Sequence, residues 1–198
     1  MKLNWVERGL VNNPLRRAGQ YLEIQWFKST LPVNAGAKIL EIGCGRGAGA
    51  ALILEKFQPA SLYLLDLDPQ MMRKAKAYLS THAHANISFY VGDAVCLPFK
   101  EACLDAVFGF GFLHHVPGWR SGLAEIARVL KTGGVYYLEE LYPSLYRNFI
   151  TKNILVHPES DRFNSHDLRE AFARNALTLQ HTFELKKMGI LGIGVKTR

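Results

Sequence analysis

The chain has 198 residues, of which 48% are hydrophobic, and it carries a formal net charge of +7. This length and apolar content fit one globular domain, which we expect to cover residues 1–198. No apolar run approaches the roughly 18–20 residues of a membrane span. Glu7 and Arg8 interrupt what would be the apolar centre of a signal peptide. The sequence therefore predicts a protein with neither a membrane span nor a secretory leader.

Three cysteines, Cys44, Cys96 and Cys103, are spaced without a pairing pattern. Such a set argues against a disulfide framework and against a zinc site, and it predicts a reducing, cytoplasmic environment. The lysines and arginines are scattered from Lys2 to Arg198. We therefore interpret the positive charge as solvated helix faces and do not expect a nucleic-acid partner.

The first predicted element is a helix. Asn13 and Pro14 suit its N-cap and its first helical position, and the pattern continues to about residue 30. Leu22 is among the apolar residues that we expect this helix to bury. Together with its flanking residues the helix is predicted to form an N-terminal lid, residues 1–34.

Strands alternate with helices in the rest of the chain. Gly133 and Gly134 are expected to cap and end the third of the later helices, and Asn164 or Ser165 is expected to cap the fourth. These helices are predicted at about residues 48–57, 70–79, 119–130 and 165–174. The strands are predicted at residues 38–42, 61–65, 87–91, 104–110, 135–139, 177–185 and 189–195.

This alternation is typical of βαβ units and predicts an α/β fold. We expect a doubly wound, mostly parallel, seven-stranded sheet of Rossmann-like type, with helices on both faces. The last two strands have no crossover helix between them, so the final strand is expected to be antiparallel. Ligands of such sheets bind beyond the carboxyl ends of the strands, which is where the unusual polar residues of this chain gather.

A glycine-rich turn follows the first strand, with Gly43, Gly45 and Gly47 in close succession. Glycines let backbone amides approach a ligand closely, and the following helix presents the positive end of its dipole. Asp66 follows 19 residues after Gly47, at the end of the second strand. A carboxylate at that place can accept both hydroxyls of a ribose, so the pair predicts a cofactor that contains a nucleoside.

Two further acids lie near this turn. Glu41 is inside the first strand, where a buried acid is costly unless it is paired; a positively charged ligand group would pair it, and the alternative partners are backbone amides or Arg46. Asp93 follows Gly92 at the end of the third strand. It either stabilises a turn or accepts a hydrogen bond from the amino group of a purine, and we favour the second role.

At this point the chain resembles a known family. The segments ILEIGCGRGAG, LLDLDPQMM, VGDAVCLPF, LDAVFGFGFLHHV and EIARVLKTGG follow one another from residue 39 to residue 134. In this order they are similar to class I S-adenosylmethionine-dependent methyltransferases that act on small molecules, such as the group found in ubiquinone and menaquinone biosynthesis. Thr132 stands where the family usually has proline, which concerns a turn and not the chemistry.

The resemblance implies that S-adenosylmethionine is the cofactor and S-adenosylhomocysteine its product. It implies further that the methionine part of the cofactor faces one group of residues, Glu41, Gly43, Cys44 and Gly45.

The same resemblance assigns the remaining cofactor contacts. Asp66 would hold the ribose and Leu67 would pack on the adenine, while Asp93 and Ala94 would contact the adenine edge. The methionine side and the methyl group would be flanked by two residues that leave the fourth strand, Gly109 and Phe110.

Methyl transfer from a sulfonium needs mainly close positioning of the acceptor, and a base is needed only where the acceptor must lose a proton. His114, His115, Glu139 and Glu140 are at the correct edge of the sheet. Neighbouring residues of an extended segment point opposite ways, so we expect one of each pair to face the site, and His114 and Glu139 are our candidates. The alternatives are that His114 only fixes its loop, or that these residues hold a metal, which no spacing supports.

The methyl acceptor is expected to be a small molecule bound between the N-terminal helix and an insertion at residues 141–164. Tyr142, Tyr146, Arg147 and Arg162 in that insertion suggest a planar or anionic compound, although they could equally pack and solvate a lid. The sequence leaves the accepting atom and the oligomeric state open.

Three other functions compete with this interpretation. The glycine turn with Asp66 also suits a nicotinamide oxidoreductase, but no Tyr-x-x-x-Lys pair is present. The positive charge would suit an RNA methyltransferase, but its usual catalytic motifs are missing. A non-catalytic protein that binds the cofactor would keep the same fold without an acceptor pocket.

Overall fold

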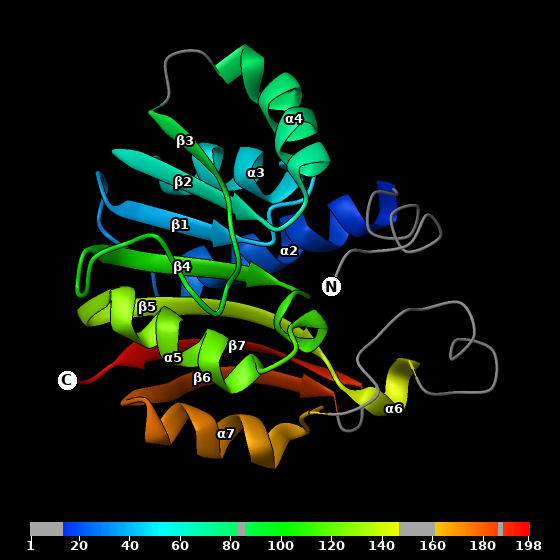
Figure 1. The fold of residues 1–198 in the computed structure, drawn as a ribbon, viewed down its shortest axis with the longest axis vertical. Helices are drawn as coiled ribbons and strands as arrows, with labels where there is room; N and C mark the ends of the chain where they lie inside the picture. Colours follow the sequence, from blue (N-terminus) through cyan, green and yellow to red (C-terminus); the bar gives the residue numbers. More distant parts are fainter. Residues whose placement is uncertain (1–13, 83–85, 147–160, 186–187) are drawn as a thin grey trace.

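The computed structural model describes residues 14–82, 86–146, 161–185 and 188–198, and Figure 1 shows their arrangement. A seven-stranded sheet runs through the molecule in the order β3-β2-β1-β4-β5-β7-β6. The strands are β1 Lys38–Ile42, β2 Ser61–Asp66, β3 Ile87–Val91, β4 Leu104–Phe110, β5 Leu130–Leu141, β6 Leu177–Leu185 and β7 Gly189–Lys196.

The predicted strand directions are confirmed. The pairs β1–β2, β1–β4, β2–β3 and β4–β5 are parallel, whereas β7 is antiparallel to both of its neighbours, β5 and β6. The chain can turn directly from β6 into β7 because antiparallel neighbours need no crossover. The final strand is therefore the reversed strand of a sheet that is otherwise parallel.

Helices cover both faces of the sheet, as predicted. One apolar core joins the sheet to α2, α3 and α4, and a second core joins the opposite face to α5 and α7. Figure 1 shows α5 and α7 in front of the sheet and α2 and α3 behind it. The helices are α2 Pro14–Thr30, α3 Ala48–Phe57, α4 Pro69–Tyr78, α5 Trp119–Val129, α6 Pro143–Tyr146 and α7 Ser165–Arg174.

The helix ends follow local chemistry. Asp68 caps α4 by accepting a hydrogen bond from the Gln70 amide at 2.9 Å, and Pro69 occupies the first helical position. Asn164, and not Ser165, is the N-cap of α7, where it forms a reciprocal capping box with Asp167. The predicted cap at Asn13 lies outside the described residues.

Two sequence predictions are wrong in detail. Leu22 was expected to be buried in α2 but is 68% exposed, because Ile24 and Phe27 form the buried face instead. Gly133 and Gly134 do not cap α5, which already ends at Val129 with an extended residue after it.

The two glycines instead lie within β5, where the pairing with β4 is irregular. Gly133 has a φ of +78°, which glycine adopts without strain. A Cβ on Gly134 would be 2.8 Å from the carbonyl oxygen of Lys131. The glycine pair therefore allows a tight detour of the strand and not a helix end.

Because five neighbouring strands, from β3 to β5, are parallel, their carboxyl ends share one edge of the sheet. The opposite edge is marked by Asp105, whose carboxylate accepts hydrogen bonds from the Lys38 amide at 2.8 Å and from Lys131 Nζ at 2.6 Å. None of the helices within the described residues has the length and apolar character that crossing a bilayer requires.

The burial of α5 predicts a stability difference between two leucines that both lie in helices. Leu123 of α5 is fully buried, whereas Leu22 of α2 is exposed. Replacing Leu123 by alanine should lower the free energy of unfolding by about 2–5 kcal/mol, because a cavity replaces apolar contacts. Leu22→Ala should change it by less than about 0.5 kcal/mol. Urea denaturation followed by circular dichroism measures both values, and similar losses would contradict this description of the core.

Candidate functional site

A cleft lies at the carboxyl edge of the sheet, and its walls enclose about 1290 Å³ of space that is partly open to solvent. The loops after β1, β2, β3 and β4 and the start of α2 form its walls. The lining residues are Arg16, Gln20, 41–46, 48–49, 65–68, Met71, 92–94, 110–112 and 115–117.

The glycine turn after β1 forms one wall of the cleft. Gly43, Gly45 and Gly47 all have positive φ angles, of +69°, +53° and +85°, which explains why the turn needs glycine. The amides of Gly43 and Cys44 both donate to the carbonyl oxygen of Leu65, at 2.8 and 3.2 Å. The turn is thereby tied to the end of the neighbouring strand β2.

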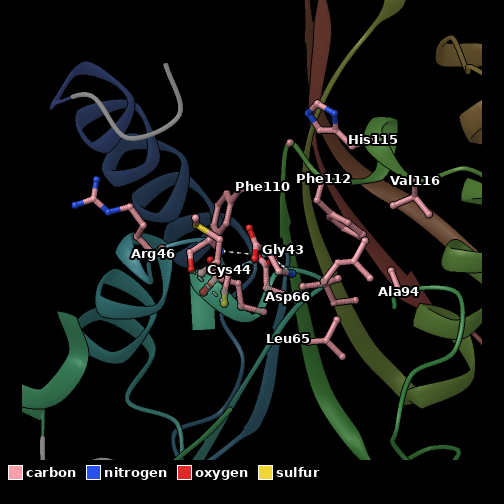
Figure 2. A pocket seen from close by; sticks show the side chains of 18 of the residues that line it. Gly43, Cys44, Arg46, Leu65, Asp66, Ala94, Phe110, Phe112, His115 and Val116 are labelled. Atoms are coloured by element: carbon pink, nitrogen blue, oxygen red, sulfur yellow. Dashed lines mark hydrogen bonds between the residues drawn. The ribbon is translucent and has the colours of Figure 1, made fainter. Parts of the chain in front are cut away.

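Glu41 is 2% exposed, yet it lines the cleft. Its Oε2 has no hydrogen-bond partner among the described residues, so the amide and Arg46 partnerships that the sequence allowed are not formed there. The Arg46 side chain points away from the other labelled residues (Figure 2). Burial, reinforced by the nearby Asp66 charge, raises the pKa of Glu41 to about 8. An unsatisfied buried acid beside a cleft is suited to a cationic or hydrogen-donating ligand group.

Asp66 fixes two backbone segments and also lines the cleft. Its Oδ2 accepts a hydrogen bond from the Gly45 amide and its Oδ1 from the Asp68 amide, each at 2.9 Å. Burial raises the pKa of Asp66, although these two hydrogen bonds oppose the effect. Each carboxylate oxygen has a second lone pair, so Asp66 can still accept hydrogen bonds from a ligand. Asp68 is the residue that caps α4.

The loops after β2 and β3 supply an apolar and a polar surface. Leu67 is 41% exposed although it is apolar, and Ala94 lines the cleft although it is largely buried. Asp93 is exposed and lines the cleft, and its Oδ1 accepts a hydrogen bond from the Val95 amide at 3.2 Å. Asp93 therefore stabilises the turn and still faces the cleft, so the two roles considered for it are compatible.

Cys44 also lines the cleft and is buried. Burial and the charges of Glu41 and Asp66 raise the pKa of its thiol well above the ordinary range. A thiol that remains protonated is a poor nucleophile, so Cys44 acts as a wall of the cleft.

Of the two residues that the sequence placed at the end of β4, only one lines the cleft. Phe110 lines the cleft, whereas Gly109 is buried beneath the ring of Phe112 and is not among the lining residues. Phe112 packs against Gly43 as well, because a Cβ at Gly43 would be 2.8 Å from its Cβ. The Phe112 ring therefore lies between two glycines and forms the wall that the sequence had assigned to Gly109.

His114 does not line the cleft. It is 7% exposed, and its Nδ1 is 2.7 Å from Oε2 of the fully buried Glu140. The two oxygens of Glu140 also accept hydrogen bonds from the backbone amides of Leu113, at 2.9 Å, and of His114, at 3.3 Å. The structure thus places His114 in the role of fixing the loop.

Glu139 does not line the cleft either. Its Oε2 accepts a hydrogen bond from Arg16 at 2.8 Å, and Arg16 also binds Glu23 at 2.6 Å. Burial raises the pKa of Glu139 to about 7, although the charge of Arg16 opposes the effect. Arg16 itself lines the cleft, so Glu139 is bonded to a residue of the cleft wall without lining the cleft itself.

His115, Val116 and Pro117 line the cleft and were not assigned to it from the sequence. The two histidines were expected in an extended segment, but residues 113–115 form a 3₁₀ turn, in which side chains rotate by about 120° per residue. Figure 2 shows His115 beyond Phe112, across the cleft from Cys44.

The predicted acceptor side is described only in part. Tyr142 donates a hydrogen bond to Glu184 at 2.9 Å. Asp161 accepts hydrogen bonds from the Gly118 amide at 3.0 Å and from Arg120 at 2.8 Å. The end of the insertion is therefore fastened beside the cleft, whereas residues 147–160 lie outside the described part. Within the described ranges, no group of three or more histidines, cysteines and acids is placed to bind a metal ion.

The segment that contains most of the cleft residues is similar to known proteins. The family described as "Methyltransferase domain" matches residues 39–134. The phthiotriol/phenolphthiotriol dimycocerosates methyltransferase of Mycobacterium tuberculosis is 35% identical over 120 residues, which are 60% of this chain and 43% of that protein. The fatty-acid O-methyltransferase of Mycolicibacterium smegmatis is 35% identical over 108 residues, 54% of this chain and 38% of that protein. The chain thus spans less than half the length of these relatives.

Solved structures share the fold at low sequence identity. An S-adenosylmethionine-dependent methyltransferase from Aquifex aeolicus has a TM-score of 0.77 and 13% identity, covering 99% of this chain and 100% of its own. One from Mesorhizobium loti has a TM-score of 0.72 and 16% identity, covering 87% and 97%. Residues 39–134 therefore match a methyltransferase domain family, and the fold around them is the one seen in solved S-adenosylmethionine-dependent methyltransferases.

Proposed function

We propose that this chain transfers the methyl group of S-adenosylmethionine to a small apolar molecule by in-line displacement. The observation that carries the proposal is the unsatisfied carboxyl of Glu41 beside the glycine turn. A buried acid without a partner fits the ammonium of a methionine moiety, which a nicotinamide dinucleotide does not have.

The cleft residues can be assigned in turn to the methionine, the ribose and the adenine of the cofactor. Glu41, Gly43 and Gly45 would hold the methionine end, and Asp66 would accept the ribose hydroxyls next to them. The exposed Leu67 offers a flat apolar surface to the adenine.

Asp93 and the amide of Ala94 would contact the adenine edge, because both line the far end of the same cleft. Phe110 would flank the methyl group, with Phe112 as the wall beside it.

Bound S-adenosylmethionine would supply a methyl group already activated by the sulfonium. The residues of this chain would hold that methyl group and exclude water around it, because transfer depends on an acceptor held at about 3–3.5 Å. Phe110, Phe112 and Val116 are suited to water exclusion, since all three present apolar side chains to the cleft.

The acceptor would bind between the loop after β4 and the N-terminal helix. Arg16 and Gln20 of α2 line the cleft, which supports the proposed lid role of residues 1–34. The anchored end of the insertion at residues 141–164 adjoins the same side through Asp161. The relatives named for fatty-acid and dimycocerosate methylation favour an apolar acceptor. We also propose a cytoplasmic location, on the basis of three free cysteines.

Calorimetric titration separates this function from the alternatives. S-adenosylmethionine and S-adenosylhomocysteine should bind, and NAD should not; binding of NAD alone would indicate an oxidoreductase. RNA binding with a steep salt dependence would favour an RNA methyltransferase. Cofactor binding without turnover of any acceptor would favour a non-catalytic binding protein.

Asp66→Ala should weaken S-adenosylhomocysteine binding by roughly 1–3 kcal/mol, because hydrogen bonds to a buried ligand are lost. Asp105→Ala makes the same change at the opposite edge of the sheet and should leave the affinity unchanged. Calorimetry on both variants, with circular dichroism to verify folding, measures the difference. Unchanged affinity in folded Asp66→Ala would contradict the ribose assignment.

The raised pKa of Glu41 predicts that the affinity for S-adenosylhomocysteine depends on pH. With its pKa at about 8, Glu41 is mostly protonated in the empty site at pH 7, whereas an ammonium ligand favours the carboxylate. Binding should therefore release about one proton at pH 7, and affinity should rise with pH up to about 8 and then level off. Calorimetry with S-adenosylhomocysteine in phosphate and in Tris detects the released proton as a difference in apparent heat.

Glu41→Gln should remove both the proton release and this part of the pH dependence. Glu139→Gln is the matched control, because it changes another buried glutamate that does not line the cleft and should keep the release due to Glu41. Equal heats in the two buffers for the unaltered protein would show that Glu41 does not face the ammonium.

A further inference from the structure

We propose that the methyl acceptor is an uncharged compound with a hydroxyl group, and that His115 takes the proton of this hydroxyl during transfer. The inference rests on the proposed methyltransferase function and adds the acceptor class and a catalytic residue. It follows from the distribution of ionisable side chains along the cleft.

The acids that line the cleft are all at its cofactor end. Glu41 belongs to β1, Asp66 and Asp68 to the loop after β2, and Asp93 to the loop after β3. On the loop after β4, the described lining residues include one ionisable side chain, His115. Imidazole exchanges its proton near neutral pH, so His115 is the described residue on that loop that is able to act as a base.

His114 and Glu140 position this base and do not replace it. Glu140 binds the amides of Leu113 and His114 and the ring of His114, which fixes the turn that carries His115. The rings of His114 and His115 lie 4.3 Å apart between centroids, with 39° between their planes. His114 is thus a positioning residue that supports His115 from beneath the cleft wall.

The charge around Arg16 argues against a carboxylate acceptor. Arg16 lines the cleft, but its guanidinium binds both Glu23, at 2.6 Å, and Glu139, at 2.8 Å. Burial raises the pKa of both glutamates, and even with one of them protonated the cluster has no net positive charge. Among the described residues, Arg16 is thus already neutralised by its own two glutamates, so it offers an anionic acceptor no net attraction.

The cleft walls around His115 are apolar. Phe110, Phe112, Val116 and Pro117 line this part of the cleft, so most of the surface offered to the acceptor is apolar. A hydroxyl on an apolar molecule fits both features, because it needs one proton acceptor and no cation.

The reaction balances without a further reactant. The hydroxyl oxygen forms a bond to the methyl carbon while the carbon–sulfur bond breaks, and the hydroxyl proton moves to a ring nitrogen of His115. The products are a methyl ether, S-adenosylhomocysteine and a protonated imidazole that returns its proton to water. Among the described residues, the ionisable group in contact with His115 is the ring of His114, which is itself bonded to Glu140.

The acceptor class is tested by binding two probes with the same ring system. The full chain, saturated with S-adenosylhomocysteine, is titrated with 2-naphthol and with 2-naphthoate, and fluorescence is recorded. The neutral hydroxyl compound should bind at least about tenfold more tightly, because a carboxylate loses its hydration among apolar walls and gains no free cation from the neutralised Arg16. Tighter binding of naphthoate, or no binding of naphthol, would overturn the proposed acceptor class.

The base is tested with His115→Gln, and His114→Gln is the matched control on the adjacent residue. With 2-naphthol as the probe acceptor and saturating S-adenosylmethionine, His115→Gln should lower kcat by about 100-fold. It should also abolish the decrease of rate at acid pH, and leave S-adenosylhomocysteine affinity within about twofold. His114→Gln can still donate to Glu140, so it should keep the acid decrease whatever its absolute rate.

The outcomes distinguish a failure of the proposed methyltransferase function from a failure of the proposed role of His115. If the cofactor does not bind to the unaltered chain, the proposed function itself fails. If the cofactor binds but naphthol is not methylated, or His115→Gln retains full activity with the acid decrease intact, the proposed role of His115 fails alone. Loss of the acid decrease in His114→Gln but not in His115→Gln would assign the proton to His114 and overturn the proposal.

Discussion

The ring of Phe112 occupies a slot between the ends of β1 and β4 that exists only because residues 43 and 109 are glycines. A side chain at either position would meet that ring. The slot holds the loop after β4 against the glycine turn after β1, so the cofactor wall and the opposite wall of the cleft keep a fixed separation. The positions of His115 and Val116 across the cleft depend on this packing.

Buried carboxylates organise the rest of the site by binding backbone amides. Asp66 joins the glycine turn to the start of α4, and Glu140 fixes the turn at residues 113–115. Burying such acids is costly unless they are bonded, and each is satisfied by amides that would otherwise lack a partner. Glu41 differs from both because one of its oxygens has no such bond among the described residues. It is therefore the acid of the cleft most suited to a ligand.

The sequence predicted the succession of strands and helices along the chain well, because hydrophobic periodicity and glycine turns are local signals. It failed where a choice depended on packing. The predicted burial of Leu22 was wrong, because Ile24 and Phe27 are the residues of α2 that pack against the sheet. The predicted cap at Gly133 was wrong, because this glycine lies in the irregular part of β5. The 3₁₀ turn around His114 follows from the bonds to Glu140, a contact 26 residues away that no local pattern reveals.

The sequence by itself determined the α/β class, the mostly parallel sheet and the edge of the sheet at which the cleft lies, because βαβ connections leave few alternatives. It also singled out Glu41, Asp66 and Asp93, which the structure brings to one cleft, because each lies in or directly after a strand that ends at that edge. Only the tertiary structure decided that His115 faces the cleft in place of His114. It also placed Glu139 behind Arg16, because the direction of a side chain beyond a strand end is set by long-range packing and ion pairs.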